Sequence, residues 1–269
     1  MPDSQANNAG TLLNYSVDTG VAIFELDAPP ANTYSHEMML QLDAAILKAR
    51  FDEAVQVLLI RGKGDKFFCA GADISMLSSS TPDFKYYFCL HSNETLCRLE
   101  QTPKLVIAAL NGHTVGGGLE VALACDIRIA RKGAGKIGLP EVNLGVLPGT
   151  GGTQRLTRVI GRARALELMA TGRTFEFEEA LQIGLIHYVY ESENFWPQVL
   201  DYAKKFTAPN KASAAVGRIK RAVVTGAELP FNEALSFERE LQQQLFASAD
   251  AKEGIAAYLE KRKPSFKSR

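Results

Sequence analysis

Runs of almost unbroken apolar residues constrain the fold of this chain more than any other sequence feature. Such runs cover residues 55–60, 104–110 and 125–130, and a further strand-like run covers residues 21–26. Segments with helical spacing lie between them, and the first has Ser35 as its expected N-cap. Strands with one face in water alternate apolar and polar residues, whereas strands covered on both faces are apolar throughout. The pattern therefore predicts an α/β fold whose strands are buried on both faces.

Helical patterns dominate the second half of the chain, after Thr153. Helices are expected over residues 162–171, 176–184, 195–206, 212–224 and 231–247. At 269 residues the chain is long enough for one or two domains. We therefore predict an α/β core with the active site over residues 11–190 and a helical C-terminal region over residues 191–269.

Charge and composition exclude several classes of protein. Thirty Lys and Arg residues balance thirty Asp and Glu residues, so the formal net charge is zero. A nucleic-acid partner is not expected, because binding to phosphates needs an excess of basic residues. The longest uncharged run, residues 105–119, is too short to cross a bilayer as a helix, so no membrane association is expected either.

Cysteine usage indicates the compartment. The four cysteines are Cys69, Cys89, Cys97 and Cys125, and no pair has C-x-x-C spacing. Disulfide scaffolds are short, secreted and rich in cysteine, and this chain is none of these. The N-terminal residues carry no basic and apolar pattern of a secretory signal. These features predict a protein of the reducing cytoplasm.

Common cofactor and metal motifs do not account for this sequence. Residues 133–138 fit G-x-G-x-x-G, but no helix is expected there and residues 153–164 contain no acidic residue, so we interpret the segment as a glycine-rich loop. The sequence has no P-loop and no G-x-S-x-G motif. His36-Glu37 lacks the second histidine of H-E-x-x-H, and no cluster has metal-ligand spacing. No metal and no bound cofactor are therefore expected.

Two segments place small residues where a backbone can approach a ligand. Residues 69–74 read C-A-G-A-D-I, and residues 111–120 read N-G-H-T-V-G-G-G-L-E. Glycines at a strand-to-helix junction are costly unless the backbone must approach something closely. Exposed N–H groups at a helix N-terminus also suit an oxyanion. The alternative is that the glycines only allow tight packing of helix on strand, and these segments alone leave both interpretations open.

A third segment, residues 138–156, reads G-L-P-E-V-N-L-G-V-L-P-G-T-G-G-T-Q-R-L. Together and in this order, the three segments resemble the crotonase (enoyl-CoA hydratase/isomerase) superfamily. The resemblance extends from about Val21 to the C-terminus and is strongest from Phe68 to Leu156. It implies a crotonase-type spiral of ββα units with a helical C-terminal trimerisation region, assembled as a homotrimer or as a homohexamer that is a dimer of trimers.

The resemblance also implies an acyl-CoA substrate, with coenzyme A entering as part of the substrate. Its thioester carbonyl is expected in an oxyanion hole formed by the backbone amides of Ala72 and Gly117, which explains the small side chains there. The residues expected to contact coenzyme A are Ala70, Ala72, Asp73, Ile74 and Lys261. For Lys261 the alternative is a solvated basic tail.

Glu120 and Glu141 are the candidate catalytic residues and match the two glutamates of the enoyl-CoA hydratase branch. Hydration needs one proton removed from water and one delivered to the α-carbon, and two carboxyls around one water can do both. In the family's usual assignment Glu141 supplies the α-carbon proton and Glu120 activates the water, although sequence does not separate the roles. Two neighbouring acids are also expected to titrate together, with one pKa raised.

The predicted activity is therefore that of an enoyl-CoA hydratase, a carbon–oxygen lyase of fatty acid β-oxidation that adds water across the 2,3 double bond of a 2-enoyl-CoA. The first alternative is another crotonase-type reaction, either Δ3–Δ2 isomerisation or hydration of a dienoyl or branched thioester. The second is a non-catalytic or RNA-binding relative, which the neutral charge and both glutamates oppose. Aromatic residues 84–88 are expected to pack against neighbouring elements or, alternatively, to line the acyl pocket. His91 and His113 are expected to be structural.

Overall fold

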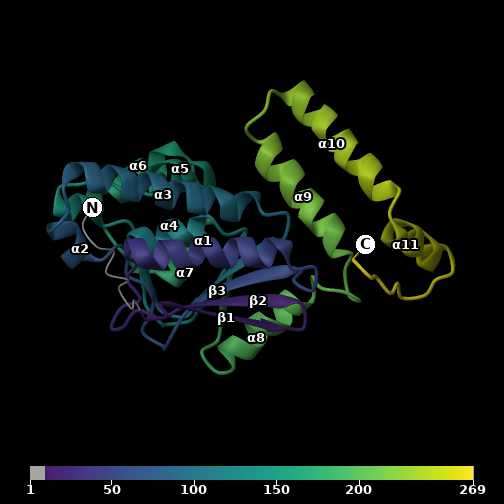
Figure 1. Ribbon diagram of the computed structural model, residues 1–269, viewed down its shortest axis with the longest axis horizontal. Helices are drawn as coiled ribbons and strands as arrows, with labels where there is room; N and C mark the ends of the chain where they lie inside the picture. The colour runs from purple at the N-terminus through teal and green to yellow at the C-terminus, as the bar shows by residue number, and fades with distance from the viewer. Residues whose placement is uncertain (1–9, 269) are drawn as a thin grey trace, which may run out of the picture.

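A six-stranded sheet forms the centre of the computed structural model, which describes residues 10–268 (Figure 1). Its strand order is β1-β2-β3-β5-β7-β10, with β1 antiparallel to β2 and the remaining neighbours parallel. The strands are β1 Leu13–Asp18, β2 Val21–Leu26, β3 Val57–Gly62, β5 Leu105–Leu110, β7 Ile127–Arg131 and β10 Tyr188–Tyr190. The predicted absence of a secretory signal rests mainly on residues 1–9, which lie outside the described residues.

A second, smaller sheet has the strand order β4-β6-β8-β9. Its strands are β4 Phe67–Cys69, β6 His113–Val115, β8 Lys136–Gly138 and β9 Phe175–Glu176. Each of β3, β5 and β7 is followed along the chain by one of these short strands and then by a helix. The predicted spiral of ββα units is therefore confirmed, although the sequence revealed only the longer strand of each unit.

Helices cover the sheets and make up most of the C-terminal region. They are α1 His36–Phe51, α2 Ile74–Ser78, α3 Pro82–Gln101, α4 Gly117–Leu123, α5 Gly152–Ile160, α6 Arg162–Thr171, α7 Phe177–Gln182, α8 Phe195–Lys204, α9 Ser213–Gly226, α10 Phe231–Phe246 and α11 Ala249–Leu259, with a 3₁₀ turn η1 at Glu141–Leu144. Ser35 caps α1 as predicted, since its hydroxyl accepts from the Met38 N–H at 3.3 Å. No helix within residues 10–268 combines the length and the apolar character that a bilayer span requires.

The large sheet is buried on both faces, as the apolar runs predict. In β3, Leu58 and Ile60 point into the larger core, whereas Val57 and Leu59 join a smaller cluster on the opposite face. Helix α8 covers that second face with Phe195 and other apolar side chains. Successive side chains of a strand point to opposite faces, so covering both makes the whole strand apolar.

The C-terminal helices α9, α10 and α11 extend away from the body that contains the sheets (Figure 1). Helix α9 is attached by close backbone contact, since a Cβ on Gly217 would come within 2.0 Å of the Pro103 carbonyl oxygen. A buried ion pair between Lys220 and Asp126, at 2.8 Å, joins the same surfaces. Because α8 packs on the sheet, only the helices after it stand apart. The domain boundary at residue 190 remains a prediction.

Gly118, in the first turn of α4, has no room for a side chain. A Cβ there would come within 2.0 Å of the Cys69 carbonyl oxygen, which belongs to the backbone and cannot rotate away. We therefore expect Gly118→Ala to destabilise the protein by about 3 kcal/mol, at the upper end of overpacking costs. Urea unfolding measures this change. An unaltered midpoint would contradict the close approach of α4 to β4. The control is Gly10→Ala, because Gly10 has open space around it and no positive φ. Gly133→Ala is not suitable, because Gly133 has a φ of +64°.

Candidate active site

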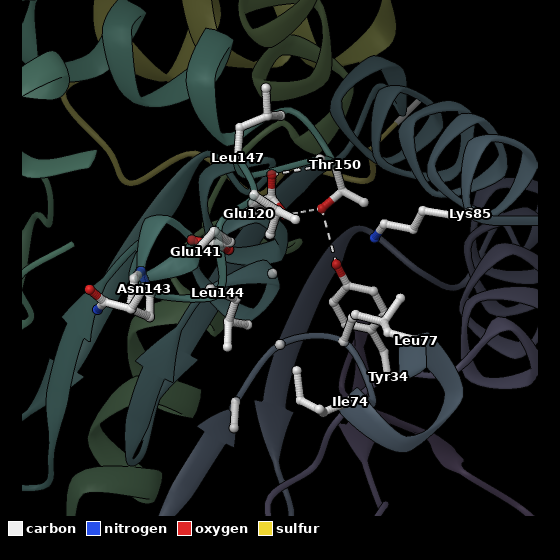
Figure 2. Close-up of a pocket in the computed structure, with 18 residues that line it drawn as sticks. Tyr34, Ile74, Leu77, Lys85, Glu120, Glu141, Asn143, Leu144, Leu147 and Thr150 are labelled. Atoms are coloured by element: carbon white, nitrogen blue, oxygen red, sulfur yellow. Dashed lines mark hydrogen bonds between the residues drawn. The ribbon is translucent and has the colours of Figure 1, made fainter. Parts of the chain in front are cut away.

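A cavity of about 310 Å³ lies between α2, the start of α4, η1 and the loop before α5 (Figure 2). The sequence-predicted residues that line it are Ala70, Ala72, Ile74, Gly117, Glu120 and Glu141. Asp73 does not line the cavity, and its carboxylate instead caps α2 by accepting from the Met76 N–H at 3.0 Å. The fold thus brings together three segments that are distant in sequence.

Lys261 is not among the residues that line this cavity in the single chain. It follows α11, at the opposite end of the molecule from α2, and it is exposed (Figure 1). The single chain therefore does not show a contact between Lys261 and coenzyme A. That role remains a prediction.

The backbone amides of Ala72 and Gly117 both lie at the cavity wall. Tyr34 forms an isolated parallel bridge with Ala72, in which its N–H donates to the Gly71 carbonyl at 2.9 Å and its carbonyl accepts from the Asp73 N–H at 3.0 Å. This pairing directs the Ala72 N–H away from Tyr34. Gly117 begins α4, where the first N–H groups have no intrahelical acceptor. Within the described residues neither amide donates a hydrogen bond, so both are available to a ligand.

Glu120 is held in one orientation by three donors. It is only 2% exposed. Its Oε1 accepts from the backbone N–H groups of Thr150 at 2.8 Å and Gly152 at 2.7 Å, and its Oε2 accepts from the Thr150 hydroxyl. A carboxylate can only accept, so these donors leave little freedom for the side chain to rotate. Glu120 therefore presents a fixed carboxylate to the cavity (Figure 2).

Glu141 lacks the set of hydrogen-bond donors that holds Glu120 in place. It begins η1, and its Oε2 is buried with no hydrogen-bond partner among the described residues. Burial raises the pKa of Glu141 from 4.5 to about 7; the negative charge of Glu120 adds to the shift, and the Lys85 ammonium opposes it. The sequence-based expectation of one raised pKa agrees with this result, but the main cause is burial rather than the neighbouring carboxylate.

The rest of the cavity wall is largely apolar. Its side chains include Ile74, Leu77, Leu144, Val146 and Leu147. From the stretch 84–88 only Lys85 lines the cavity in the single chain, which favours the expected packing role for the aromatic side chains over the acyl-pocket alternative. Phe88 is buried against the Tyr34 ring at a centroid distance of 6.0 Å, whereas Tyr86 and Tyr87 are each 66% exposed.

His91 and His113, the two histidines that were expected to be structural, lie outside the cavity. The ring Nδ1 of His113 accepts from the Lys136 N–H at 3.0 Å, and His91 packs against His36 at a centroid distance of 5.3 Å. Their predicted structural roles agree with these contacts. Within residues 10–268, no group of three or more His, Cys, Asp or Glu side chains is arranged to hold a metal ion.

The cavity residues that sequence reasoning missed include three that bear on the two glutamates: Tyr34, Lys85 and Thr150. Thr150 stands in the quoted G-T-G-G segment, but a motif does not show which atom reaches a carboxylate. Tyr34 lies 116 positions from its partner Thr150, so no local pattern relates the two.

Comparison with known proteins defines the class to which this fold and site belong. The model of the enoyl-CoA hydratase/isomerase family matches residues 16–269. The chain therefore belongs to the enoyl-CoA hydratase/isomerase family, as the resemblance predicts.

Individual relatives are similar over nearly the whole chain. A probable enoyl-CoA hydratase from Bacillus subtilis is 38% identical over 258 residues, covering 95% of this chain and 98% of that protein. A crotonyl-CoA hydratase from Syntrophomonas wolfei is also 38% identical, covering 93% and 95%. The solved structure of an enoyl-CoA hydratase from Geobacillus kaustophilus has a TM-score of 0.94 at 47% identity, covering 97% and 98%.

Proposed function

We propose that this protein is an enoyl-CoA hydratase, a carbon–oxygen lyase that adds water across the 2,3 double bond of a 2-enoyl-CoA. The observation that carries the proposal is that Glu120 and Glu141 line one cavity with the amides of Ala72 and Gly117. Relatives named enoyl-CoA and crotonyl-CoA hydratase, similar over most of the chain, support it. Coenzyme A takes part as the carrier of the acyl group, and no further cofactor is proposed.

The two amides bind the thioester oxygen. As water attacks the β-carbon, the π electrons move toward that oxygen and negative charge develops on it. The N–H groups of Ala72 and Gly117 stabilise this charge, and because they belong to the backbone they are already in place before the reaction. Hydrogen bonds that strengthen in the transition state lower the barrier, whereas uniform binding of the substrate does not.

The two glutamates handle the two protons. Glu120, fixed by Thr150 and Gly152, accepts a proton from the attacking water as the new C–O bond forms. Glu141, with a pKa of about 7, retains a proton near neutral pH and delivers it to the α-carbon. The net result is addition of H and OH, with no change in redox state. A raised pKa suits the donor because an acid works best when its pKa lies near the working pH.

Assaying the purified protein on crotonyl-CoA tests the proposal. We expect loss of the enoyl-thioester absorbance and formation of the 3-hydroxyacyl product. A panel of 2-enoyl, 3-enoyl, dienoyl and branched thioesters separates hydration from Δ3–Δ2 isomerisation. Absence of hydration across the 2-enoyl thioesters, or isomerisation as the main reaction, would overturn the proposal.

The pH dependence of kcat/KM is a direct consequence of the raised pKa of Glu141. Because the protonated carboxyl is the form that donates, kcat/KM is expected to be level up to about pH 7 and then to fall about tenfold per pH unit. A profile measured on crotonyl-CoA from about pH 5 to 9 checks this. Activity that rises through pH 7 would contradict Glu141 as the proton donor.

Lys85→Met provides the control for this profile. The Lys85 ammonium lowers the pKa of Glu141, so its removal is expected to move the basic limb to higher pH. If the basic limb of the Lys85→Met profile stays in place or moves to lower pH, that limb reports the titration of a group other than Glu141.

We further propose that the chain assembles as a homotrimer or homohexamer through its C-terminal helices. Large apolar side chains of α9, α10 and α11 are exposed in the single chain, which is typical of an association surface. They include Ile219, Val223, Phe231, Phe246 and Ile255. In such an assembly Lys261 of one copy contacts coenzyme A bound to another.

All four cysteines are free, which agrees with the proposed cytoplasmic location.

A further inference from the structure

One buried residue, Tyr34, is linked to three of the groups on which the proposed reaction depends: the amides of Ala72 and Gly117 and, through Thr150, the carboxylate of Glu120. It is 3% exposed and lies just before α1. We propose that Tyr34 is a positioning residue that holds the two oxyanion amides and the water-activating carboxylate in one fixed arrangement. The inference rests on the proposed function and adds to it the residue that joins the two halves of the site.

The backbone of Tyr34 positions the first amide. Its hydrogen bonds to Gly71 and Asp73, at 2.9 and 3.0 Å, fix the peptide units on both sides of Ala72. In a parallel bridge the residue between the two bonded groups turns its own N–H to the other side. The Ala72 amide thus faces away from Tyr34, where it lines the cavity.

The side chain of Tyr34 packs against the residue that carries the second amide. A Cβ on Gly117 would lie 2.1 Å from the Tyr34 hydroxyl oxygen and 2.6 Å from its ring carbons. The tyrosine therefore occupies the space beside Gly117 and limits movement of the first turn of α4. Phe88 supports the ring at a centroid distance of 6.0 Å.

The hydroxyl of Tyr34 completes a relay to Glu120. It lies 3.0 Å from the Thr150 hydroxyl oxygen, and the Thr150 hydroxyl donates to Glu120 Oε2 (Figure 2). Since the single proton of Thr150 is used on the carboxylate, the Thr150 oxygen must accept from Tyr34. Burial and the charge of Glu120 raise the pKa of Tyr34 well above 10, so Tyr34 keeps its proton and donates throughout the working pH range.

Tyr34→Phe tests the relay, because it removes only the hydroxyl and keeps the ring. We expect kcat on crotonyl-CoA to fall about tenfold, the size expected when one buried hydrogen bond is lost. We expect KM to change less than about twofold, because the hydroxyl acts through Thr150 on Glu120 rather than on the substrate.

Tyr15→Phe is the matched control. The Tyr15 hydroxyl is also buried, but it has no hydrogen-bond partner among the described residues and lies outside the cavity. Its loss is expected to leave kcat, KM and the pH profile as in the wild type. This comparison separates loss of a relay from loss of a buried hydroxyl.

A double-mutant cycle with Thr150→Val shows whether Tyr34 acts through Thr150. If it does, adding Tyr34→Phe to Thr150→Val causes little further loss, because the relay is already broken. Thr150→Val also tests the relay by itself should Tyr34→Phe fail to fold, and it is expected to show a similar loss of kcat with little change in KM. Thr150→Ser keeps the hydroxyl and is expected to retain activity.

Three results would overturn the inference. The first is a kcat of Tyr34→Phe equal to that of Tyr15→Phe, and the second is a double variant whose loss of kcat equals the product of the losses of Tyr34→Phe and Thr150→Val. The third is a Tyr34→Phe variant in which only KM changes. These differ from failure of the proposed function, in which the wild type itself hydrates no 2-enoyl-CoA. In that case the positioning role is overturned with the function on which it rests.

Discussion

Glu141→Gln is expected to lower kcat for crotonyl-CoA hydration by about 10³-fold, within the range that general acid–base groups contribute. The amide has the shape of the acid but has no acidic proton to deliver to the α-carbon. Binding of a saturated acyl-CoA should change little, since the amides of Ala72 and Gly117 and the apolar wall are untouched. Steady-state kinetics and calorimetric titration with butyryl-CoA measure the two effects. Near-normal turnover would refute the assigned role.

The same variant should be more stable than the wild type at alkaline pH. The pKa of Glu141 is about 7 in the folded chain and 4.5 when unperturbed, so the folded state binds more protons between these values. Stability is therefore lost as the pH rises from about 4.5 to 7, and the neutral Gln avoids this loss. We expect a higher Tm for Glu141→Gln at about pH 8 and a smaller difference at about pH 5. A lower Tm at pH 8 would show that the carboxylate is stabilised by contacts absent from the structure.

Glu120→Gln is expected to lower kcat by about 10³-fold as well, because an amide cannot accept the proton of the attacking water. Its carbonyl oxygen can still accept from the N–H groups of Thr150 and Gly152, so the loop before α5 should keep its place. Removing the negative charge also lowers the pKa of Glu141 and moves the basic limb of any residual activity to lower pH. Rates and pH profiles of the variant test both effects.

The Glu120→Gln/Glu141→Gln double variant distinguishes joint action from separate contributions. When two groups act on one step, removing the second costs little after the first is lost. We expect the double variant to be only slightly slower than either single variant. A loss equal to the product of both would show that the glutamates act in separate steps.

The main sheet was predictable because a simple physical rule governs it. Strands covered on both faces must be apolar along their length, and β2, β3, β5 and β7 lie within a few residues of the predicted runs. Strand β1 was missed because its pattern, L-N-Y-S-V-D, alternates apolar and polar residues, as in an edge strand, and lacks the continuous apolar run of the central strands. Strands β4, β6 and β8 were missed because three residues are too few for any periodicity to be seen.

The candidate site was predictable in its residues but not in its connections. Motifs identified the two glutamates and the two amide-bearing residues, and the cavity contains all four. The three donors to Glu120 and the unpartnered oxygen of Glu141 depend on how distant segments meet. Those contacts make two residues of the same type chemically different.

The sequence by itself determined which segments become buried strands, which residue types are available for catalysis, and to which family the chain belongs. These properties depend on local patterns of polarity and on short motifs, both of which can be seen along the chain. Only the tertiary structure decided that Glu141 has a raised pKa, that Glu120 is held by three donors, and that Tyr34 reaches Thr150. Burial and hydrogen bonding are set by neighbours in space, and here those neighbours lie as many as 116 positions apart.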